Sequence, residues 1–300
     1  MEQYYFILGA ADPEMVKIEK TLRESNQVFA IATTNGARVN AGNAYNADPV
    51  NIPEGYIPVI IEAEPANIGE WNEFVRIDHH RHGDYGYDLG YERYFEASSL
   101  GQLYKLLNLK PTADVLTLAA MDHCFADALI GKCANVDGKE VLNLKIENIC
   151  AGTGLSIADV ESKINFWLQK MKNTNGVKII NGIEVVNLTE HNMGTGYSSE
   201  LLCSQVAAIL SGKAVLLKHQ DSEYSPLKVT INGNNSPDTI KYFKDEFCRL
   251  NYFQNIYGVE SRRYAGGYFS SNTIEPLNFT VTLNQIKVYT EIKPPSPKMS

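Results

Sequence analysis

The stretch Arg76-Ile77-Asp78-His79-His80-Arg81-His82-Gly83-Asp84 places an acid and two histidines directly after a short apolar run. Side chains alternate between the two faces of a β-strand, so three adjacent metal-binding side chains can converge only where a strand ends and the backbone turns. In an open α/β sheet, ligands bind beyond the carboxyl ends of the strands. The stretch therefore predicts an α/β fold with a site at the end of a strand at residues 74–77.

Length and composition indicate a two-domain globular protein. The chain has 300 residues, of which 44% are hydrophobic and 21% charged. The formal net charge of −8 makes long nucleic acid a poor partner. No run approaches the roughly 18 apolar residues of a membrane helix, and the first residues lack the positive charge of a signal peptide. We therefore expect a cytoplasmic protein with no membrane segment, and a homodimer stays open.

Hydrophobic patterning predicts a mostly parallel sheet in the first half of the chain. Expected strands cover residues 4–8, 28–33, 57–61 and 74–77, and a helix covers 14–25. The polar segment 34–51 is long for a loop, which commonly indicates function. The apolar run 115–121 is interpreted as a further strand that leads into Asp122 and His123. Repeated strands and helices with metal-binding side chains at strand ends favour a parallel sheet.

The second half of the chain predicts a smaller α/β domain with a mixed sheet. Expected strands at 177–180 and 183–186 flank Asn181-Gly182, the strongest short hairpin signal. Helices at 198–210 and from 236, strands at 214–217 and 227–231, a loop around 262–268 and one or two strands within 279–292 complete it. We expect a metal-binding domain at 1–148, a connecting helix at 149–175, a C-terminal domain at 176–292 and a disordered tail at 293–300.

Three motifs, in this order, resemble those of the DHH phosphoesterase superfamily. Asp78-His79-His80 follows a strand, Ala97-Ser98-Ser99 opens a helix, and Asp122 follows a later apolar run. More weakly, Gly266-Gly267 resembles the Gly-Gly-rich loop of the family's DHHA1-like C-terminal domain. The resemblance implies a catalytic α/β domain and a smaller C-terminal domain, with substrate between them.

One feature departs from the family's pattern. The family's first motif normally supplies a histidine and two aspartates after the first strand. Here Leu8-Gly9-Ala10-Ala11-Asp12 retains a single acid and no histidine. The first motif is therefore degenerate, and the usual two-metal site is in question.

The resemblance implies that Asp78 bridges a pair of Mn²⁺ or Mg²⁺ ions, and that one of His79 and His80 is a ligand while the other faces substrate. These three are the catalytic candidates, and they are metal candidates too. The further metal candidates are Asp122, His123, Glu62, Glu64 and Asp12. Carboxylates mixed with imidazoles suit Mn²⁺ or Zn²⁺, whereas an all-acid cluster would favour Mg²⁺, and one or two ions are expected. Structural alternatives stay open: a turn at residues 78–80, an N-cap with a core imidazole at 122–123, and solvated carboxylates at 62 and 64.

The substrate-binding candidates are two arginines, two glycines and two serines: Arg262, Arg263, Gly266, Gly267, Ser98 and Ser99. A guanidinium fork suits bidentate phosphate binding, and glycines let the backbone approach a ligand. The serines are expected as helix N-caps, although a helix N-terminus can also bind phosphate. A solvated arginine pair beside a tight turn is the structural alternative.

Two functions of different classes fit these residues. The first is a metal-dependent phosphoesterase that hydrolyses a phosphodiester or phosphoanhydride bond in a small nucleotide, a cyclic nucleotide or a short oligonucleotide. The second is a protein of the same fold that has lost catalysis and senses or sequesters a nucleotide. The degenerate first motif favours the second reading. A purely structural α/β protein with incidental ligand-type side chains is the third.

Overall fold

The computed structural model describes residues 2–173, 177–180, 183–189, 191, 193–195, 198–220, 228–233, 237–250, 253–259 and 264–269. The chain divides into two compact units, Met1–Lys145 and Ile146–Ser300. The hairpin turn expected at Asn181-Gly182, the strands expected within 279–292 and the tail at 293–300 lie outside the described residues. Within the described part of the chain, no helix combines the length and apolar character required to cross a membrane.

The first unit is built on a four-stranded sheet whose strands are all parallel, as the sequence predicts. The order is β2 (Val28–Ile31), β1 (Tyr4–Leu8), β5 (Ile57–Ile61) and β6 (Val75–Ile77). β1 pairs with both β2 and β5, and β5 pairs with β6. Since the strands run the same way, their carboxyl ends meet at one edge of the sheet.

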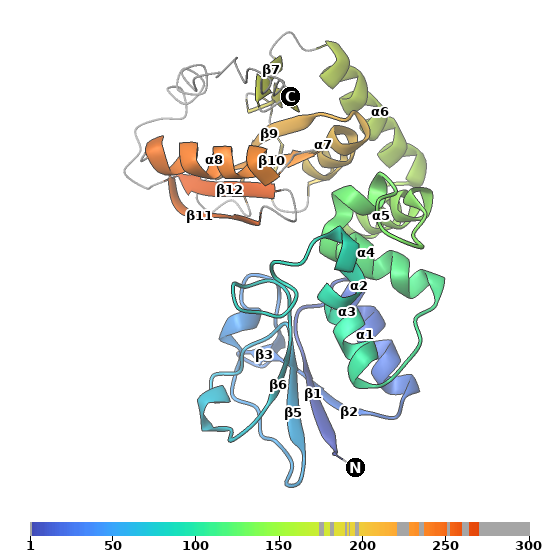
Figure 1. The fold of residues 1–300 in the computed structure, drawn as a ribbon, viewed down its shortest axis with the longest axis vertical. Helices are drawn as coiled ribbons and strands as arrows, with labels where there is room; N and C mark the ends of the chain where they lie inside the picture. Colours follow the sequence, from blue (N-terminus) through green and yellow to red (C-terminus); the bar gives the residue numbers. More distant parts are fainter. Residues whose placement is uncertain are drawn as a thin grey trace, which may run out of the picture. The chain divides into compact units, whose positions relative to one another are not determined.

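The two faces of this sheet are covered differently. Along one side lie helices α1 (Pro13–Glu24), α2 (Tyr94–Ala97), α3 (Ser99–Leu106) and α4 (Ala113–Leu129) (Figure 1). On the other side Ile7 and Ile60 pack against loop residues, among them Ala32, Val39, Ala44, Ala47 and Ala63. This cover carries only short elements: β3 (Thr33–Thr34), β4 (Ala37–Arg38), η1 (Ala44–Asn46) and η2 (Ile68–Glu70). The long polar segment therefore forms one wall of the core.

The strand expected at residues 115–121 is wrong, because this run lies inside α4. Val115, Ala119 and Ala120 are fully buried. A short apolar run buried on all sides has no polar face from which a period of 2 or 3.6 could be read, so strand and helix look alike. The backbone leaves helical geometry once, at Cys124, with φ −144° and ψ 55°. Asp122 and His123 therefore precede a kink in a helix, and not a turn after a strand.

The second unit contains a six-stranded mixed sheet in the order β11-β12-β10-β9-β8-β7. β7 (Val177–Ile180) and β8 (Ile183–Asn187) pair antiparallel, which confirms the predicted hairpin pairing, and β8 pairs parallel with β9 (Ala214–His219). The remaining strands, β10 (Lys228–Gly233), β11 (Phe253–Val259) and β12 (Tyr264–Phe269), pair antiparallel. The predicted α/β class, parallel in one unit and mixed in the other, is confirmed.

Helices of the second unit begin where the sequence predicts them. α6 (Ile157–Asn173) is preceded by Ser156, whose hydroxyl contacts Asp159, and α7 (Ser199–Leu210) by Ser198, whose oxygen accepts from the Leu201 N–H. α8 covers Pro237–Leu250, and α5 (Gly138–Thr153) spans the boundary between the units. Val185, Leu216, Val229, Ile231 and Phe243 belong to the core under the mixed sheet.

Gly266 and Gly267 were expected in a loop, and this is wrong. Both lie inside β12, where they pair with Thr230 and Val229 of β10. Glycine weakens a strand, but cross-strand pairing on both sides of β12 overrides that local preference. Arg262 and Arg263 lie outside the described residues.

Candidate metal centre

The carboxyl edge of the parallel sheet gathers the chemistry of the first unit. Glu62 follows β5 directly, and Asp78, His79 and His80 follow β6. β1 leads through Gly9 to Asp12 and Glu14, which stand at the N-cap and in the first turn of α1. Strand ends and a helix start thus bring acids and imidazoles from distant parts of the sequence to one place.

Glu62 adopts a left-handed backbone conformation, with φ +50°. Its N–H donates to the Ile77 carbonyl at 3.1 Å, and its side chain is nearly buried, with the whole residue 6% exposed. This conformation costs about 1 to 2 kcal/mol for a residue with a Cβ, so the surrounding structure must hold it. Strained backbone of this kind concentrates at functional sites, and here it turns a carboxylate at the end of the central β5.

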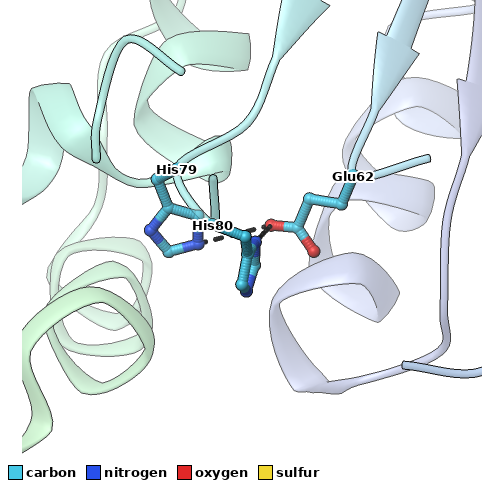
Figure 2. A group of neighbouring side chains, drawn as sticks. All are labelled: Glu62, His79 and His80. Carbon is cyan, nitrogen blue, oxygen red and sulfur yellow. Dashed lines mark ion pairs between the residues drawn. The ribbon is translucent and has the colours of Figure 1, made fainter. Parts of the chain in front are cut away.

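His79 is fully buried and lies among three carboxylates. Its Nε2 atom is 3.1 Å from Asp122 Oδ2, 3.4 Å from Glu62 Oε1 and 3.9 Å from Glu14 Oε2. Figure 2 shows His79 and His80 directed toward the Glu62 carboxylate, which comes from the neighbouring strand. Gly86 packs closely against His79, since a Cβ on Gly86 would lie 2.7 Å from the His79 Cβ.

The four side chains of Glu14, Glu62, His79 and Asp122 form a set that could hold a metal ion, with one donor atom from each lying within 4.8 Å of the others. Ligand atoms about 2.1 Å from one divalent ion lie about 3 Å apart when adjacent and about 4.2 Å apart when opposite in an octahedron. The distances from His79 Nε2 fall in this interval. An overlapping set joins Glu62, His79 and His80.

The donor chemistry fits a divalent cation. Glu14 Oε2 and Glu62 Oε1 are buried oxygens without a hydrogen bond, although Glu14 Oε1 accepts from the Leu100 N–H at 2.9 Å. Buried carboxylate oxygens without donors are costly unless a cation or a proton neutralises them. Carboxylates with one imidazole suit Mn²⁺ and, less selectively, Mg²⁺ or Zn²⁺.

The electrostatics of the acids give the same indication. Burial, followed by the nearby charges of Asp122 and Glu62, raises the pKa of Glu14 well above its usual value. Burial, then Glu62 and Asp122, raises the pKa of Asp12 to about 7. Asp12 also caps α1, because its Oδ1 accepts from the Met15 N–H at 2.7 Å. The cluster therefore holds more negative charge than it can stabilise alone, and a divalent cation would offset it.

Asp78 belongs to neither metal-compatible set. Its Oδ1 accepts from the N–H groups of His79 at 2.7 Å and His80 at 3.0 Å, and Tyr45 donates to its Oδ2 at 2.9 Å. Although burial acts in the opposite direction, the hydrogen bonds and charge of His80 and the Tyr45 hydroxyl lower the pKa of Asp78 to about 2. The side chain of Asp78 therefore fixes the turn that presents the two histidines.

His80 stands at the accessible side of the cluster. Its side chain is 41% exposed, and its Nδ1 lies 3.1 Å from Asp78 Oδ1. Beside it, Arg81 stacks on the Tyr45 ring at 3.4 Å and pairs with Glu64 at 2.7 Å. Glu64 also pairs with Arg76 at 3.5 Å. It therefore binds two arginines and belongs to neither metal-compatible set.

His123 also lies outside the two metal-compatible sets. Its Nδ1 is 2.9 Å from His79 Nδ1 and its Nε2 is 2.8 Å from the Leu89 carbonyl oxygen. Both ring nitrogens thus have partners within the protein.

The predicted helix cap at Ser98 is confirmed. Ser98 Oγ accepts from the Gly101 N–H at 3.0 Å and donates to the Phe95 carbonyl at 3.2 Å, and Ser98 and Ser99 are both fully buried. The Ser99 hydroxyl is buried without a hydrogen bond.

Sequence reasoning missed Glu14, which it assigned only to a helix. The available signal was its position: Glu14 follows Asp12-Pro13, which starts a helix right after a strand, so its side chain must lie near the carboxyl end of β1. A buried acid in the first turn of such a helix is a metal candidate. The segment after β1 therefore contributes Glu14 to a metal-compatible set, whereas Asp12 belongs to neither set and caps α1.

Comparisons with known proteins give little. No family model matches the chain. No curated protein matches it either. Among solved structures, a pGpG-specific phosphodiesterase, PggH from Vibrio cholerae, aligns over 95% of this chain and 99% of its own with 12% identity and a TM-score of 0.39. A likeness at this level carries no argument about the function of the chain.

Proposed function

We propose that the protein is a metal-dependent phosphoesterase. It hydrolyses a phosphodiester or phosphoanhydride bond in a small nucleotide, a cyclic nucleotide or a short oligonucleotide. The observation that carries the proposal is the convergence of Glu14, Glu62, His79 and Asp122 at the carboxyl edge of a parallel sheet. Their separation along the sequence makes a chance surface cluster a poor explanation, and Glu14, Glu62 and His79 are nearly or fully buried.

In the proposal these four residues hold Mn²⁺ or Mg²⁺. When bound, such an ion polarises a phosphoryl oxygen and lowers the pKa of a bound water. The chain contributes the shape of the site: Glu62 is held by its backbone conformation, and Asp78 holds the turn of residues 78–80.

His80 is the residue proposed to exchange a proton with substrate or water. The Asp78 carboxylate accepts a hydrogen bond from Nδ1–H of His80 and so fixes the orientation of the imidazole ring. A half-exposed imidazole oriented by a buried carboxylate is a common arrangement for a general acid or base. Asp78 then acts through His80 and is a positioning residue.

The substrate is proposed to be small. The net charge of −8 and the acidic cluster oppose binding of a polyanionic strand. Arg81 and Arg76, which pair with Glu64, place positive charge near the carboxyl edge of the parallel sheet. Arg262, Arg263, Gly266 and Gly267 remain candidates for further substrate contacts, although the structure describes no side chain of the arginine pair.

The second candidate function is nucleotide binding without catalysis. One observation favours it: Asp12 is the single acid left in the first motif, and its Oδ1 is used to cap α1. Asp12, the acid of the degenerate first motif, belongs to neither metal-compatible set among the described residues.

The test separates metal binding from proton transfer. The chelator-treated protein is titrated with Mn²⁺ and then assayed against a panel of cyclic dinucleotides, linear dinucleotides, nucleotide polyphosphates and a nucleotide monophosphate. We expect Mn²⁺-dependent turnover of at least one diester or anhydride. Glu62→Gln should lose both Mn²⁺ and turnover, whereas His80→Asn should keep Mn²⁺ and lose turnover. His82→Asn is the control, since His82 is exposed and contacts Tyr87.

Three outcomes contradict the proposal. Turnover that survives chelation removes the metal from the chemistry. Tight nucleotide binding with no turnover selects the second candidate function. Absence of Mn²⁺ binding in the wild-type protein removes the metal centre altogether.

A further inference from the structure

A second buried histidine lies directly behind His79. The two rings stack at 29° with centroids 5.2 Å apart, and their Nδ1 atoms lie 2.9 Å apart. His79 is 0% exposed and His123 is 1% exposed. We propose that His123 is a positioning residue that holds His79 in the tautomer protonated at Nδ1, so that the Nε2 lone pair of His79 faces the carboxylate cluster. This inference rests on the metal centre of the proposed function.

The direction of the two hydrogen bonds follows from the carbonyl oxygen with which His123 is in contact. The Leu89 carbonyl oxygen, 2.8 Å from His123 Nε2, can only accept a hydrogen bond. His123 Nε2 must therefore carry a hydrogen. In a neutral imidazole the other nitrogen is then an acceptor, so His123 Nδ1 accepts. His79 Nδ1 is the donor in the 2.9 Å contact.

Once Nδ1 of neutral His79 donates, Nε2 of the same ring carries the lone pair. This is the atom that lies 3.1 Å from Asp122 Oδ2 and 3.4 Å from Glu62 Oε1. A metal ion can be bound through it, as metal ligation requires an unprotonated nitrogen. Ligating histidines commonly have their second ring nitrogen fixed by a hydrogen bond.

The carboxylates themselves favour the opposite tautomer. An N–H at Nε2 would be attracted by Glu14, Glu62 and Asp122, so the acids alone would draw the proton onto the atom that has to bind the ion. His123 opposes this by offering an acceptor at Nδ1, and the Leu89 carbonyl holds His123 in the form that can accept. The two imidazoles and one carbonyl therefore work as a unit, which explains why a second histidine is buried where only one can reach the cluster.

The test uses the full chain in two variants. His123→Leu introduces an apolar side chain of similar size and removes the acceptor. His123→Asn retains an acceptor oxygen near the position of Nδ1. Mn²⁺ binding to the chelator-treated proteins is measured by calorimetry, and ¹⁵N-histidine spectra of the metal-free proteins report the tautomer of each ring. His82→Asn is again the matched control.

We expect His123→Leu to lose affinity for Mn²⁺ by about ten- to a hundredfold, the usual effect of removing a partner of a metal-ligating histidine. His79 should lose its Nδ1–H form in that variant. His123→Asn should recover much of the affinity. In the wild-type spectra His123 should be protonated at Nε2.

An Nδ1–H tautomer of His123 in the wild-type protein overturns the inference, and this spectrum is obtained even if His123→Leu does not fold. Unchanged Mn²⁺ affinity in a folded His123→Leu variant overturns it as well. A wild-type protein that binds no Mn²⁺ contradicts the proposed function, whereas the metal-free spectra still decide the role of His123.

Discussion

Gly9 lies so close to Glu62 that a Cβ on Gly9 would stand 2.3 Å from the Glu62 carbonyl oxygen. The Gly9 N–H also donates to the Ile61 carbonyl at 2.9 Å. This contact joins the end of β1 to the end of β5, at the residue whose φ of +50° turns the chain into the cluster. The position of one proposed ligand is therefore set by the absence of a side chain at Gly9, the residue directly after β1.

Replacing Gly9 with Ala should destabilise the protein and weaken the metal centre together. The new methyl group must displace backbone, which costs about 1 to 3 kcal/mol in a packed region. Glu62 should move with it, and Mn²⁺ affinity should fall. Urea unfolding and Mn²⁺ titration measure the two effects. Gly69→Ala is the control, since nothing lies within 4 Å of its Cβ position. Wild-type Mn²⁺ affinity in Gly9→Ala contradicts the prediction.

Glu62→Gly and Glu62→Ala should differ in stability although both remove the same carboxylate. Glycine adopts φ +50° without the steric cost that alanine pays, so the glycine variant should be more stable by about 1 kcal/mol. Urea unfolding in the presence of chelator measures this difference. Both variants should lose Mn²⁺ to the same extent. Equal stability would show that the backbone at residue 62 relaxes without strain.

Glu14→Gln should have opposite effects with and without metal. The variant removes a buried carboxyl group whose pKa is raised by burial and by the charges of Asp122 and Glu62. At pH 8 in chelator it should be more stable than the wild type by about 1 to 3 kcal/mol. In excess Mn²⁺ the order should reverse, because bound metal stabilises only a folded chain that retains its ligands. Glu24→Gln, on the exposed end of α1, is the control. Lower stability in chelator contradicts the prediction.

The metal-free protein should lose stability as pH rises above about 4 toward 7. The pKa of Asp12 is about 7, above its ordinary 3.8, so the folded state keeps a proton that the unfolded chain has released in this interval. Each bound proton then changes the free energy of unfolding by about 1.4 kcal/mol per pH unit. Asp78 acts in the other direction, but only below pH 3.8, since its pKa is lowered to about 2.

Asp12→Asn isolates this effect, because asparagine caps a helix as well as aspartate does. Guanidinium unfolding between pH 5 and pH 8 in chelator should show a smaller loss of stability in the variant. Saturating Mn²⁺ should remove the loss in the wild-type protein, as the ion replaces the protons. Identical pH dependence in variant and wild type would show that Asp12 ionises in the folded protein as freely as in the unfolded chain.

Local features of the sequence determined most elements of both units. β1 and β5 occupy the predicted residues, because apolar runs bounded by turn residues identify buried strands. The caps at Ser98, Ser156 and Ser198 follow from side chains that bond to their own helix starts. His79, Asp122 and Glu62 became metal candidates through their residue types and through the family resemblance of the motifs around them. These are properties of a few neighbouring residues, so no tertiary structure is needed to predict them.

Only the tertiary structure decided which side chains meet. Asp78 and His79 are adjacent in sequence, yet the backbone N–H groups capture the Asp78 carboxylate and leave His79 to face the cluster. Glu14 joins because the end of β1 and the start of α1 lie at the same edge as the ends of β5 and β6. The apolar run before Asp122 lies in α4, and its burial hid the helical period that a sequence pattern would have needed. Convergence of ligands depends on strand order and helix packing, which are set by contacts between residues far apart in the chain.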